Sequence, residues 1–245
     1  MYAIILAGGY AKRLGPIGEN KAKALIEIAG KPIINYIVEK LENIEVIKKI
    51  IVSTNQKFGD DFHQWNKKFK FRKVKIIIEP SRCEDEKLGA IGGIEFVIKK
   101  ENIDDDIIII GGDNLSGIDF NELIRFFKGK PVNALYDIKN IEEAKKFGVV
   151  KTDNNKIIDI EEKPEQPKST LISMCIYIYP KRILKYFNDY IKEGNNKDSP
   201  GYFLKWLCKK EEVYSFVYDG FWFDIGDVKT LEKADNFMRS TNYLL

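Results

Sequence analysis

A glycine pair followed by cations is the first stretch of this sequence that could carry chemistry. Gly8 and Gly9 end a short apolar run, and the cations Lys12, Arg13 and Lys23 come soon after them. Glycine has no Cβ, so a ligand can approach its backbone closely. Bare amide N–H groups and cations suit a bound polyphosphate. The stretch therefore predicts a phosphate-binding loop, with an ordinary strand-to-helix turn and a solvated basic loop as the alternative. Neither G-x-G-x-x-G nor G-x-x-x-x-G-K-[ST] is present.

Two carboxylates lie in motifs that could hold a metal ion. Asp113 follows an apolar run and two glycines, and Asp224 lies in the stretch Trp222–Asp227. A carboxylate at the end of a parallel strand is well placed for Mg²⁺, a hard cation that prefers oxygen ligands. Two such groups can clamp one or two Mg²⁺ ions on a nucleotide. For each aspartate the alternative is a turn or helix-capping role.

Alternating strand-like and helix-like stretches must position these residues in the first half. Helices are expected to begin near Pro32, Gly59 and Gly89. This order predicts a parallel sheet with helices on both faces. Ligands bind at the carboxyl ends of such strands, which places Gly8 and Gly112 at one edge of the sheet. The expected strands are Ala3–Leu6, Ile50–Ser53, Val74–Ile78 and Ile107–Ile110.

The second half is less regular, and we expect it to supply an inserted lid within a single domain over residues 1–245. The nucleotide-binding half would span about 1–130, the other half about 131–227 and a closing helix about 228–239. Further helices are expected at Phe120–Phe127 and after Pro180 and Ser199. The expected strands are Val132–Tyr136, Phe147–Lys151, Ile157–Glu161, Leu171–Tyr179 and Val213–Val217.

Composition excludes several classes of protein. A net charge of +3 over 245 residues does not indicate a nucleic-acid or membrane partner, and the cation-rich stretch 67–73 is expected to be a solvated helix end. Three scattered cysteines indicate reduced thiols in the cytoplasm. A single histidine argues against a Ser-His-Asp triad. We expect no signal peptide, no membrane span and no hexapeptide-repeat extension after the closing helix.

Several motifs, in order, resemble the sugar-1-phosphate nucleotidyltransferases, the family of glucose-1-phosphate thymidylyltransferase and uridylyltransferase. They are Leu6–Gly9, Arg13-Leu14, Lys23–Leu25, Lys31–Ile34, Leu88–Gly93, Gly112–Asn114, Phe147–Val150, Glu161–Pro164 and Trp222–Gly226. Ala11, Lys12 and Ala22 depart from the family's usual Gly, Thr and Pro. The resemblance implies an α/β fold with a Rossmann-like, three-layer, mixed and mostly parallel sheet, helices on both faces and an inserted lid or sugar-binding subregion.

The resemblance also assigns roles to residues of this chain. Asp113 and Asp224 would be the Mg²⁺ ligands, and Arg13 and Lys23 the catalytic cations. The residues expected to bind the nucleotide are Leu6, Ala7, Gly8, Gly9, Glu79 and Gly89. Those expected to bind the sugar phosphate are Asn114, Gly148, Glu162 and Lys163.

The implied reaction condenses a nucleoside triphosphate with a sugar 1-phosphate, such as glucose 1-phosphate, to give a nucleoside-diphosphate sugar and pyrophosphate. Family frequency favours dTTP or UTP. Glu79 stands where thymidylyltransferases have glutamine, and a carboxylate only accepts hydrogen bonds, which suits guanine or cytosine. Glu79 could equally turn away from the base. Alternatives are a non-catalytic nucleotide-sugar-binding regulator and a cytidylyltransferase acting on a non-sugar phosphate. A homo-oligomer is possible, with a number that the sequence does not give.

Overall fold

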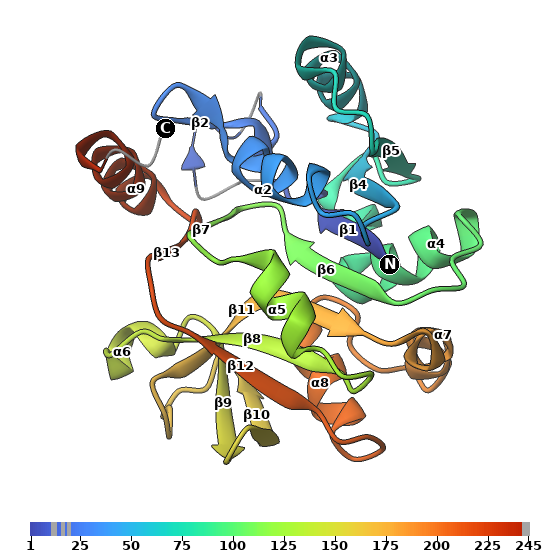
Figure 1. The fold of residues 1–245 in the computed structure, drawn as a ribbon, viewed down its shortest axis with the longest axis vertical. Coiled ribbons are helices and arrows are strands. Elements are labelled where there is room, and N and C mark those ends of the chain that lie inside the picture. Colours follow the sequence, from blue (N-terminus) through green and yellow to red (C-terminus); the bar gives the residue numbers. More distant parts are fainter. Residues whose placement is uncertain (11–13, 16–17, 19–20, 242–245) are drawn as a thin grey trace. The chain divides into compact units, whose positions relative to one another are not determined.

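The protein was analysed as a computed structural model that describes residues 1–10, 14–15, 18 and 21–241 (Figure 1). The chain divides into two compact units. Unit 1 comprises residues 1–2, 88–110 and 118–220, and unit 2 comprises residues 3–87, 111–117 and 221–245. The sequence predicted two halves that meet near residue 130. In the structure, residues 88–110 group with the later part of the chain, and residues 221–245 group with the earlier part.

Unit 2 contains three of the four first-half strands that the sequence predicted, and the fourth, at Ile107–Ile110, belongs to unit 1. Its strands follow the order β5-β4-β1, and β4 and β5 pair in parallel from Ile50↔Val74 to Asn55↔Glu79. The strands are nearly continuous apolar runs because both of their faces are buried. Their bounds, with those of the intervening helices, are β1 Tyr2–Leu6, α2 Ile33–Glu42, β4 Lys49–Asn55, α3 Gly59–Phe69 and β5 Val74–Glu79.

Unit 2 also holds two small antiparallel ribbons that the sequence did not predict. The strands β2 (Glu27–Ile28) and β3 (Lys31–Pro32) form one ribbon. The strands β7 (Asn114–Ser116) and β13 (Trp222–Asp224) form the other. A buried cluster supports both ribbons and the closing helix α9 (Val228–Ser240). Its buried members are Leu14, Ile26, Ile28, Ile33, Leu115, Ile225, Ala234 and Met238.

Unit 1 is built mainly on antiparallel pairing. Its strands follow the order β6-β11-β8-β12-β10-β9. The pairings β6–β11, β8–β11, β10–β12 and β9–β10 are antiparallel, and β8–β12 is parallel. The predicted mixed sheet is confirmed, and its antiparallel pairings lie mainly in this unit. The strands are β6 Ile107–Gly111, β8 Val132–Asp137, β9 Gly148–Asp153, β10 Lys156–Glu162, β11 Leu171–Tyr179 and β12 Tyr214–Tyr218.

Two helices of unit 1, α7 (Leu184–Lys192) and α8 (Pro200–Leu207), pack through aromatic rings. Phe187 and Phe203 stack with centroids 4.4 Å apart, and Tyr179 meets both rings edge to face. Such contacts add about 0.5–1.5 kcal/mol per pair beyond area burial. The helices are α4 Gly89–Lys100, α5 Phe120–Phe126, α6 Ile141–Ala144, α7 Leu184–Lys192 and α8 Pro200–Leu207. Among the described helices of the whole chain, none has the length and apolar character to cross a bilayer.

Candidate active site

The ribbon β7–β13 brings the backbones of the two residues predicted to bind the metal close together within unit 2. Asp224 pairs with Asn114 in the antiparallel register, and the Ile225 N–H donates to the Asp113 carbonyl oxygen at 3.1 Å. Directly paired residues of an antiparallel ribbon lie about 4.5–5.5 Å apart. Asp113 immediately precedes the residue paired with Asp224, although 110 residues separate the two aspartates in the sequence.

A predicted catalytic cation lies against one of these carboxylates. The Lys23 ammonium is 2.5 Å from Asp113 Oδ2, with 15% and 30% of the two side chains exposed. Lys23 begins the short 3₁₀ helix η2 (Lys23–Leu25), whose Ala24 and Leu25 are buried and fix the position of the turn. The structure thus joins Lys23 to Asp113, and the roles predicted for them, a catalytic cation and a metal ligand, stay predictions.

The buried Asn114 side chain links the two strands of the ribbon. Its side chain is 3% exposed and accepts a hydrogen bond from Trp222 Nε1 at 2.5 Å, while its Nδ2 donates to Asp113 Oδ1 at 3.3 Å. Leaving either group unpaired in this buried position would cost about 1–3 kcal/mol. Asn114 thus orients Asp113, and its expected contact with a sugar phosphate stays a prediction.

The donor set at this ribbon fits a magnesium ion that a ligand helps to hold. Mg²⁺ is commonly bound by one or two carboxylates, with phosphate oxygens and water completing the shell. Asp113 and Asp224 supply the two carboxylates, and no group of three or more His, Cys, Asp or Glu suited to a metal occurs in the described part of the chain. The arrangement matches a cation shared with phosphate rather than one caged by protein alone.

The glycine loop lies beside this ribbon. The Gly112 N–H donates to the Leu6 carbonyl at 2.9 Å, which confirms that Gly8 and Gly112 belong to the same edge. Ala7 is almost buried, and its N–H donates to the Ser53 carbonyl at 2.8 Å. Gly8 is tied to the end of β4 because Asn55 Nδ2 donates to its carbonyl at 2.9 Å.

Glu79 ends β5 next to this loop. A Cβ built on Gly8 would lie 3.8 Å from both Glu79 carboxyl oxygens. Ser53 Oγ donates to Glu79 Oε1 at 2.8 Å, and only 8% of Glu79 is exposed. Burial raises the pKa of Glu79 above its ordinary value, while the Ser53 hydrogen bond opposes this. The structure therefore joins Glu79 to Gly8, two of the residues predicted to bind the nucleotide. Gly9 has open space where a Cβ would stand.

Arg13, the second predicted catalytic cation, lies outside the described residues, as do Ala11 and Lys12. Their predicted contacts with a triphosphate stay predictions.

Unit 1 contains three of the four residues predicted to bind the sugar phosphate, Gly148, Glu162 and Lys163, whereas Asn114 belongs to unit 2. A Cβ on Gly148 would lie 3.1 Å from Glu162 Oε2, so Gly148 leaves room for that carboxylate. Burial raises the pKa of Glu162, while the neighbouring Lys163 cation opposes this. Lys163 follows the strand at φ 47°, a left-handed conformation that is uncommon outside glycine. The exposed Lys163 side chain is available to an anion.

Two further residues contact Glu162 that the sequence did not indicate. The Ser199 side chain hydrogen-bonds the carboxylate, and a Cβ on Gly201 would overlap Glu162 Oε2. Ser199-Pro200 carried only the signal of a helix start, and that prediction is confirmed by α8. No local pattern connects these positions with Glu162, because the contact depends on the packing of α8 against β10.

Gly89 is explained by packing within unit 1. It adopts φ 74°, and a Cβ there would lie 2.6 Å from the Lys197 carbonyl oxygen. The Ile91 N–H donates to the same oxygen at 2.9 Å. These contacts account for the glycine without a ligand, and the predicted contact of Gly89 with a nucleotide stays a prediction.

Comparisons with known proteins agree with the fold and the arrangement of these motifs. The profile of the family described as "Nucleotidyl transferase" matches residues 2–241. A solved structure of a "Putative Glucose-1-Phosphate Thymidylyltransferase" from Bacillus anthracis, in complex with a sucrose, superposes with a TM-score of 0.83. It is 25% identical, and the match covers 99% of this chain and 97% of that one. The chain belongs to the nucleotidyl transferase family, and its Rossmann-like α/β fold is that of the family.

Two curated relatives are more similar in sequence. A "Putative mannose-1-phosphate guanyltransferase" of Sulfolobus acidocaldarius is 34% identical over 226 residues, which is 91% of this chain and 59% of the relative. A glucose-1-phosphate adenylyltransferase of Thermosipho africanus is 31% identical over 245 residues, which is 92% of this chain and 58% of the relative. The chain thus spans less than two thirds of the length of these relatives, and their names differ in both base and sugar.

Proposed function

We propose that this protein transfers a nucleotidyl group from a nucleoside triphosphate to a sugar 1-phosphate, releasing pyrophosphate and forming a nucleoside-diphosphate sugar. The observations that carry the proposal are the ion pair of Lys23 with Asp113 and the β7–β13 pairing, which brings the backbone of Asp224 close to that of Asp113. Two acidic groups and a lysine at the end of a glycine loop suit a magnesium nucleotide. Family membership supports the same reaction class.

Asp113 and Asp224 would hold Mg²⁺, in keeping with the divalent metal that sugar nucleotidyltransferases generally use. When bound, the ion supplies Lewis-acid stabilisation of charge on the phosphates. Lys23 and Arg13 would neutralise the remaining negative charge of the triphosphate. A phosphate oxygen of the sugar phosphate is already a competent nucleophile, so this chain needs no general base. Its residues act by positioning and by electrostatic stabilisation.

The sugar phosphate would be held by residues of unit 1. Glu162 accepts hydrogen bonds from sugar hydroxyls, and Gly148 leaves the space for that carboxylate. Lys163 serves as a point charge for the phosphate. A desolvated carboxylate favours hydroxyl donors strongly, because it has lost the water that would otherwise satisfy it.

Glu79 would read the base. It lies against Gly8 within ordinary contact distance, and in its ionised form it offers acceptors only. Guanine presents two adjacent donors and cytosine one amino group, whereas thymine and uracil present a donor beside a carbonyl. The proposal therefore ranks GTP first and CTP second, with dTTP or UTP, the triphosphates favoured by family frequency, below them.

Two other functions remain as alternatives. Ala11 and Lys12, which replace the family's usual residues, motivate a regulator that binds nucleotide sugars without turnover. A cytidylyltransferase acting on a non-sugar phosphate would keep the same triphosphate site. The pairing of Lys23 with the Asp113 carboxylate favours catalysis over the regulator, since a binding protein has no need of a lysine and two acidic residues in one region. The Asp-Ile-Gly motif at residues 224–226 favours a sugar phosphate over a non-sugar phosphate.

A matrix of triphosphates and phosphorylated acceptors tests the proposal. Pyrophosphate release is measured with GTP, CTP, UTP, dTTP and ATP against glucose 1-phosphate, mannose 1-phosphate and phosphocholine, with Mg²⁺ and with EDTA. We expect Mg²⁺-dependent release with at least one sugar phosphate and none with phosphocholine. Nucleotide-sugar binding without release would support the regulator instead, and release with phosphocholine alone would support the non-sugar transferase.

A further inference from the structure

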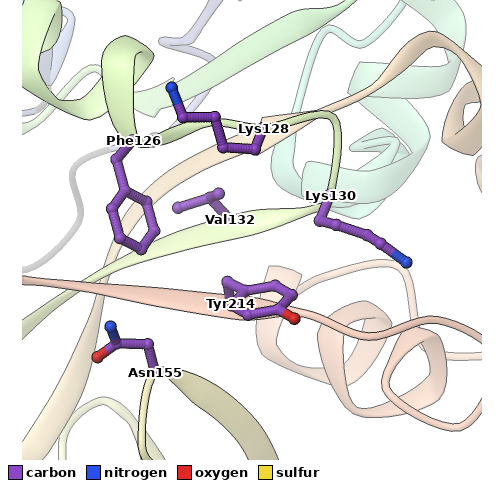
Figure 2. Close-up of a pocket in the computed structure, with 6 residues that line it drawn as sticks. All are labelled: Phe126, Lys128, Lys130, Val132, Asn155 and Tyr214. Carbon is purple, nitrogen blue, oxygen red and sulfur yellow. The ribbon is translucent and has the colours of Figure 1, made fainter.

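A cavity of about 340 Å³ lies within unit 1, and none of its lining residues belongs to the motifs used above (Figure 2). It is formed where α5 ends, where β8 and β12 begin and where β9 turns into β10. Its lining residues are Phe126, Lys128, Lys130, Val132, Asn155 and Tyr214. None of them belongs to the glycine loop, to the two carboxylate motifs or to the group around Glu162. The volume is at the small end of the usual ligand range of about 300–1,000 Å³.

The cavity has an apolar floor and aromatic walls. Val132 is 2% exposed and pairs in register with Tyr214, so these two side chains lie on the same face of the sheet. Phe126 meets Phe216 edge to face at 5.5 Å, and this contact fixes one wall. Figure 2 shows the Phe126 and Tyr214 rings around Val132. A flat ring is the shape that two aromatic side chains and a branched aliphatic floor accommodate best.

The rim carries an excess of positive charge. Lys128 and Lys130 line the cavity, and Lys156 follows Asn155 directly. Two acidic groups offset part of this charge: Glu212 lies 2.8 Å from the Lys156 ammonium and 3.6 Å from that of Lys130, and Asp153 also acts on Lys156. Within the described ranges, no acidic group forms an ion pair with Lys128. Three cations against two acidic groups leave the rim, at Lys128 above all, suited to an anion.

The loop that carries the lysines is held in place. Gly129 adopts φ 74°, a left-handed turn that glycine takes at no steric cost. Arg182 Nη1 donates to the Gly129 carbonyl at 2.6 Å, and Arg182 Nη2 donates to Glu211 at 3.2 Å. Lys128 and Lys130 therefore extend from an anchored turn, which lowers the entropic cost of binding an anion there.

We propose that this cavity binds a small aromatic anion, a single flat ring that carries a phosphate or a carboxylate. The ring lies on Val132 between Phe126 and Tyr214. The anionic group meets Lys130 and Lys128 at the rim. Asn155 and the Tyr214 hydroxyl each offer a donor and an acceptor to polar atoms at the ring edge.

Phenyl phosphate is the probe for this site, and the Val132 methyl groups are the reporter. Methyl NMR of the whole chain follows their shifts during titration with phenyl phosphate, benzoate, inorganic phosphate and phenol. We expect saturable shifts with phenyl phosphate and at least about 10-fold weaker binding of phosphate and of phenol, because each lacks one half of the interaction. Benzoate separates the two anions: binding as tight as that of phenyl phosphate shows that charge, not phosphate geometry, is recognised.

Matched variants test the assignment of residues. Lys128→Gln with Lys130→Gln should weaken phenyl phosphate about 10-fold or more, as expected for two charged contacts at a partly exposed rim. Lys146→Gln, which removes an exposed lysine paired with Glu143 at 2.7 Å in the same unit, should leave binding unchanged. The Val132 shift should persist in Asp113→Asn, which separates this site from the proposed nucleotide site.

Three outcomes would overturn the proposal. The first is the absence of a Val132 shift at millimolar phenyl phosphate. The second is equal binding of inorganic phosphate, and the third is equal binding by the double lysine variant and the wild type. Tyr214→Phe keeps the aromatic ring that lines the cavity and removes only the hydroxyl, so it tests the contact of that hydroxyl with polar atoms at the edge of the bound ring.

Discussion

In unit 2 the Asp113 carboxylate lies 2.5 Å from the Lys23 ammonium, whereas in unit 1 the Glu162 carboxylate packs against Gly148, Gly201 and Ser199. The first group is compensated by a cation 90 residues away in the sequence. The second is desolvated, and its pKa is raised by burial. A compensated carboxylate suits exchange between cations and phosphates, while a desolvated one suits neutral hydroxyl donors.

The carboxylates of the two units also differ in the length and covering of the strands that carry them. Asp113 and Asp224 lie at the ends of a three-residue ribbon, where the side chains are partly open to solvent. Glu162 ends the seven-residue strand β10 and lies under helix α8. One fold therefore offers both a carboxylate paired with a cation and a carboxylate packed against a helix, and the difference comes from local packing rather than from residue type.

The largest expected effect comes from removing charge at the ribbon. Asp113→Asn keeps the shape of the side chain but loses the ligand charge, and kcat/KM for pyrophosphate release should fall about 10³-fold. Asp227→Asn is the matched control from the same motif. Asp227 Oδ1 accepts from the Thr230 N–H at 2.8 Å as the N-cap of α9. Asparagine also caps helices, so activity should be retained. Equal losses in both variants would contradict the assignment.

A smaller effect is expected from changing Glu79, the buried carboxylate of unit 2. Glu79→Gln converts an acceptor into a donor and acceptor pair, so the ratio of GTP to UTP turnover should fall about 10- to 100-fold, the cost of one unpaired buried group. In the wild type the same ratio should fall as the pH is lowered toward the raised pKa of Glu79, because the protonated acid donates.

The control for this experiment is Glu86→Gln, since Glu86 lies in the same loop region and accepts from the Arg82 N–H at 2.8 Å. Its GTP to UTP ratio should match the wild type at every pH. A ratio independent of pH in the wild type and unchanged by Glu79→Gln would show that Glu79 does not read the base.

A still smaller effect is expected on KM for the sugar phosphate and none on KM for the triphosphate. Gly201→Ala places a Cβ against Glu162 Oε2, so the carboxylate has to move. We expect KM for the sugar phosphate to rise about 10-fold, within the range that small misplacements cause, with KM for the triphosphate unchanged. Ser199→Ala removes the hydrogen bond alone and should give a weaker version of the same pattern. An equal rise in both KM values would indicate general damage to the fold.

The smallest effect concerns stability. The folded state holds the Glu162 proton more tightly than the unfolded state, since burial raises the folded pKa above the ordinary value of 4.5. Between that value and the raised pKa, the folded state binds more protons, so the free energy of unfolding falls as pH rises. Glu162→Gln lacks this loss, and urea denaturation should show it gaining relative to the wild type from pH 4 to pH 8.

Glu161→Gln on the same strand is the control for losing a charge, because Glu161 pairs with Lys168 at 3.1 Å. A constant difference between Glu162→Gln and the wild type across this pH range would contradict the desolvation of Glu162.

The sequence predicted the long elements because their signals are local. The apolar runs of β1, β4, β5 and β6 and the helix starts at Gly59 and Gly89 are confirmed. The ribbons β2–β3 and β7–β13 were not predicted, since strands of two or three residues carry no period. Cys175, which stands where the resembled family commonly has glycine, adopts φ 56° in a bulge of β11, and this bulge was not predicted because only the pairing reveals the register shift.

The residues of the candidate site likewise divide into those that local motifs predicted and those that depend on contacts between distant parts of the chain. Asp113, Asp224 and Lys23 were identified through motifs, and the ribbon then explains why motifs so far apart belong together. Ser199 and Gly201 were missed because their role is a contact with Glu162 across more than 30 intervening residues. Arg13 lies outside the described residues, so its place at the site stays a prediction.

The pairing of β7 with β13 also fixes when the catalytic edge can exist during synthesis. Asp113 leaves the ribosome about 110 residues before Asp224, and Trp222, the hydrogen-bonded partner of Asn114, comes equally late. Contacts of such high sequence separation form slowly and after local structure. A nascent chain that has released everything up to Gly220 therefore still lacks half of its proposed metal ligands, and competence would come only after the segment that carries Trp222 and Asp224 has been released.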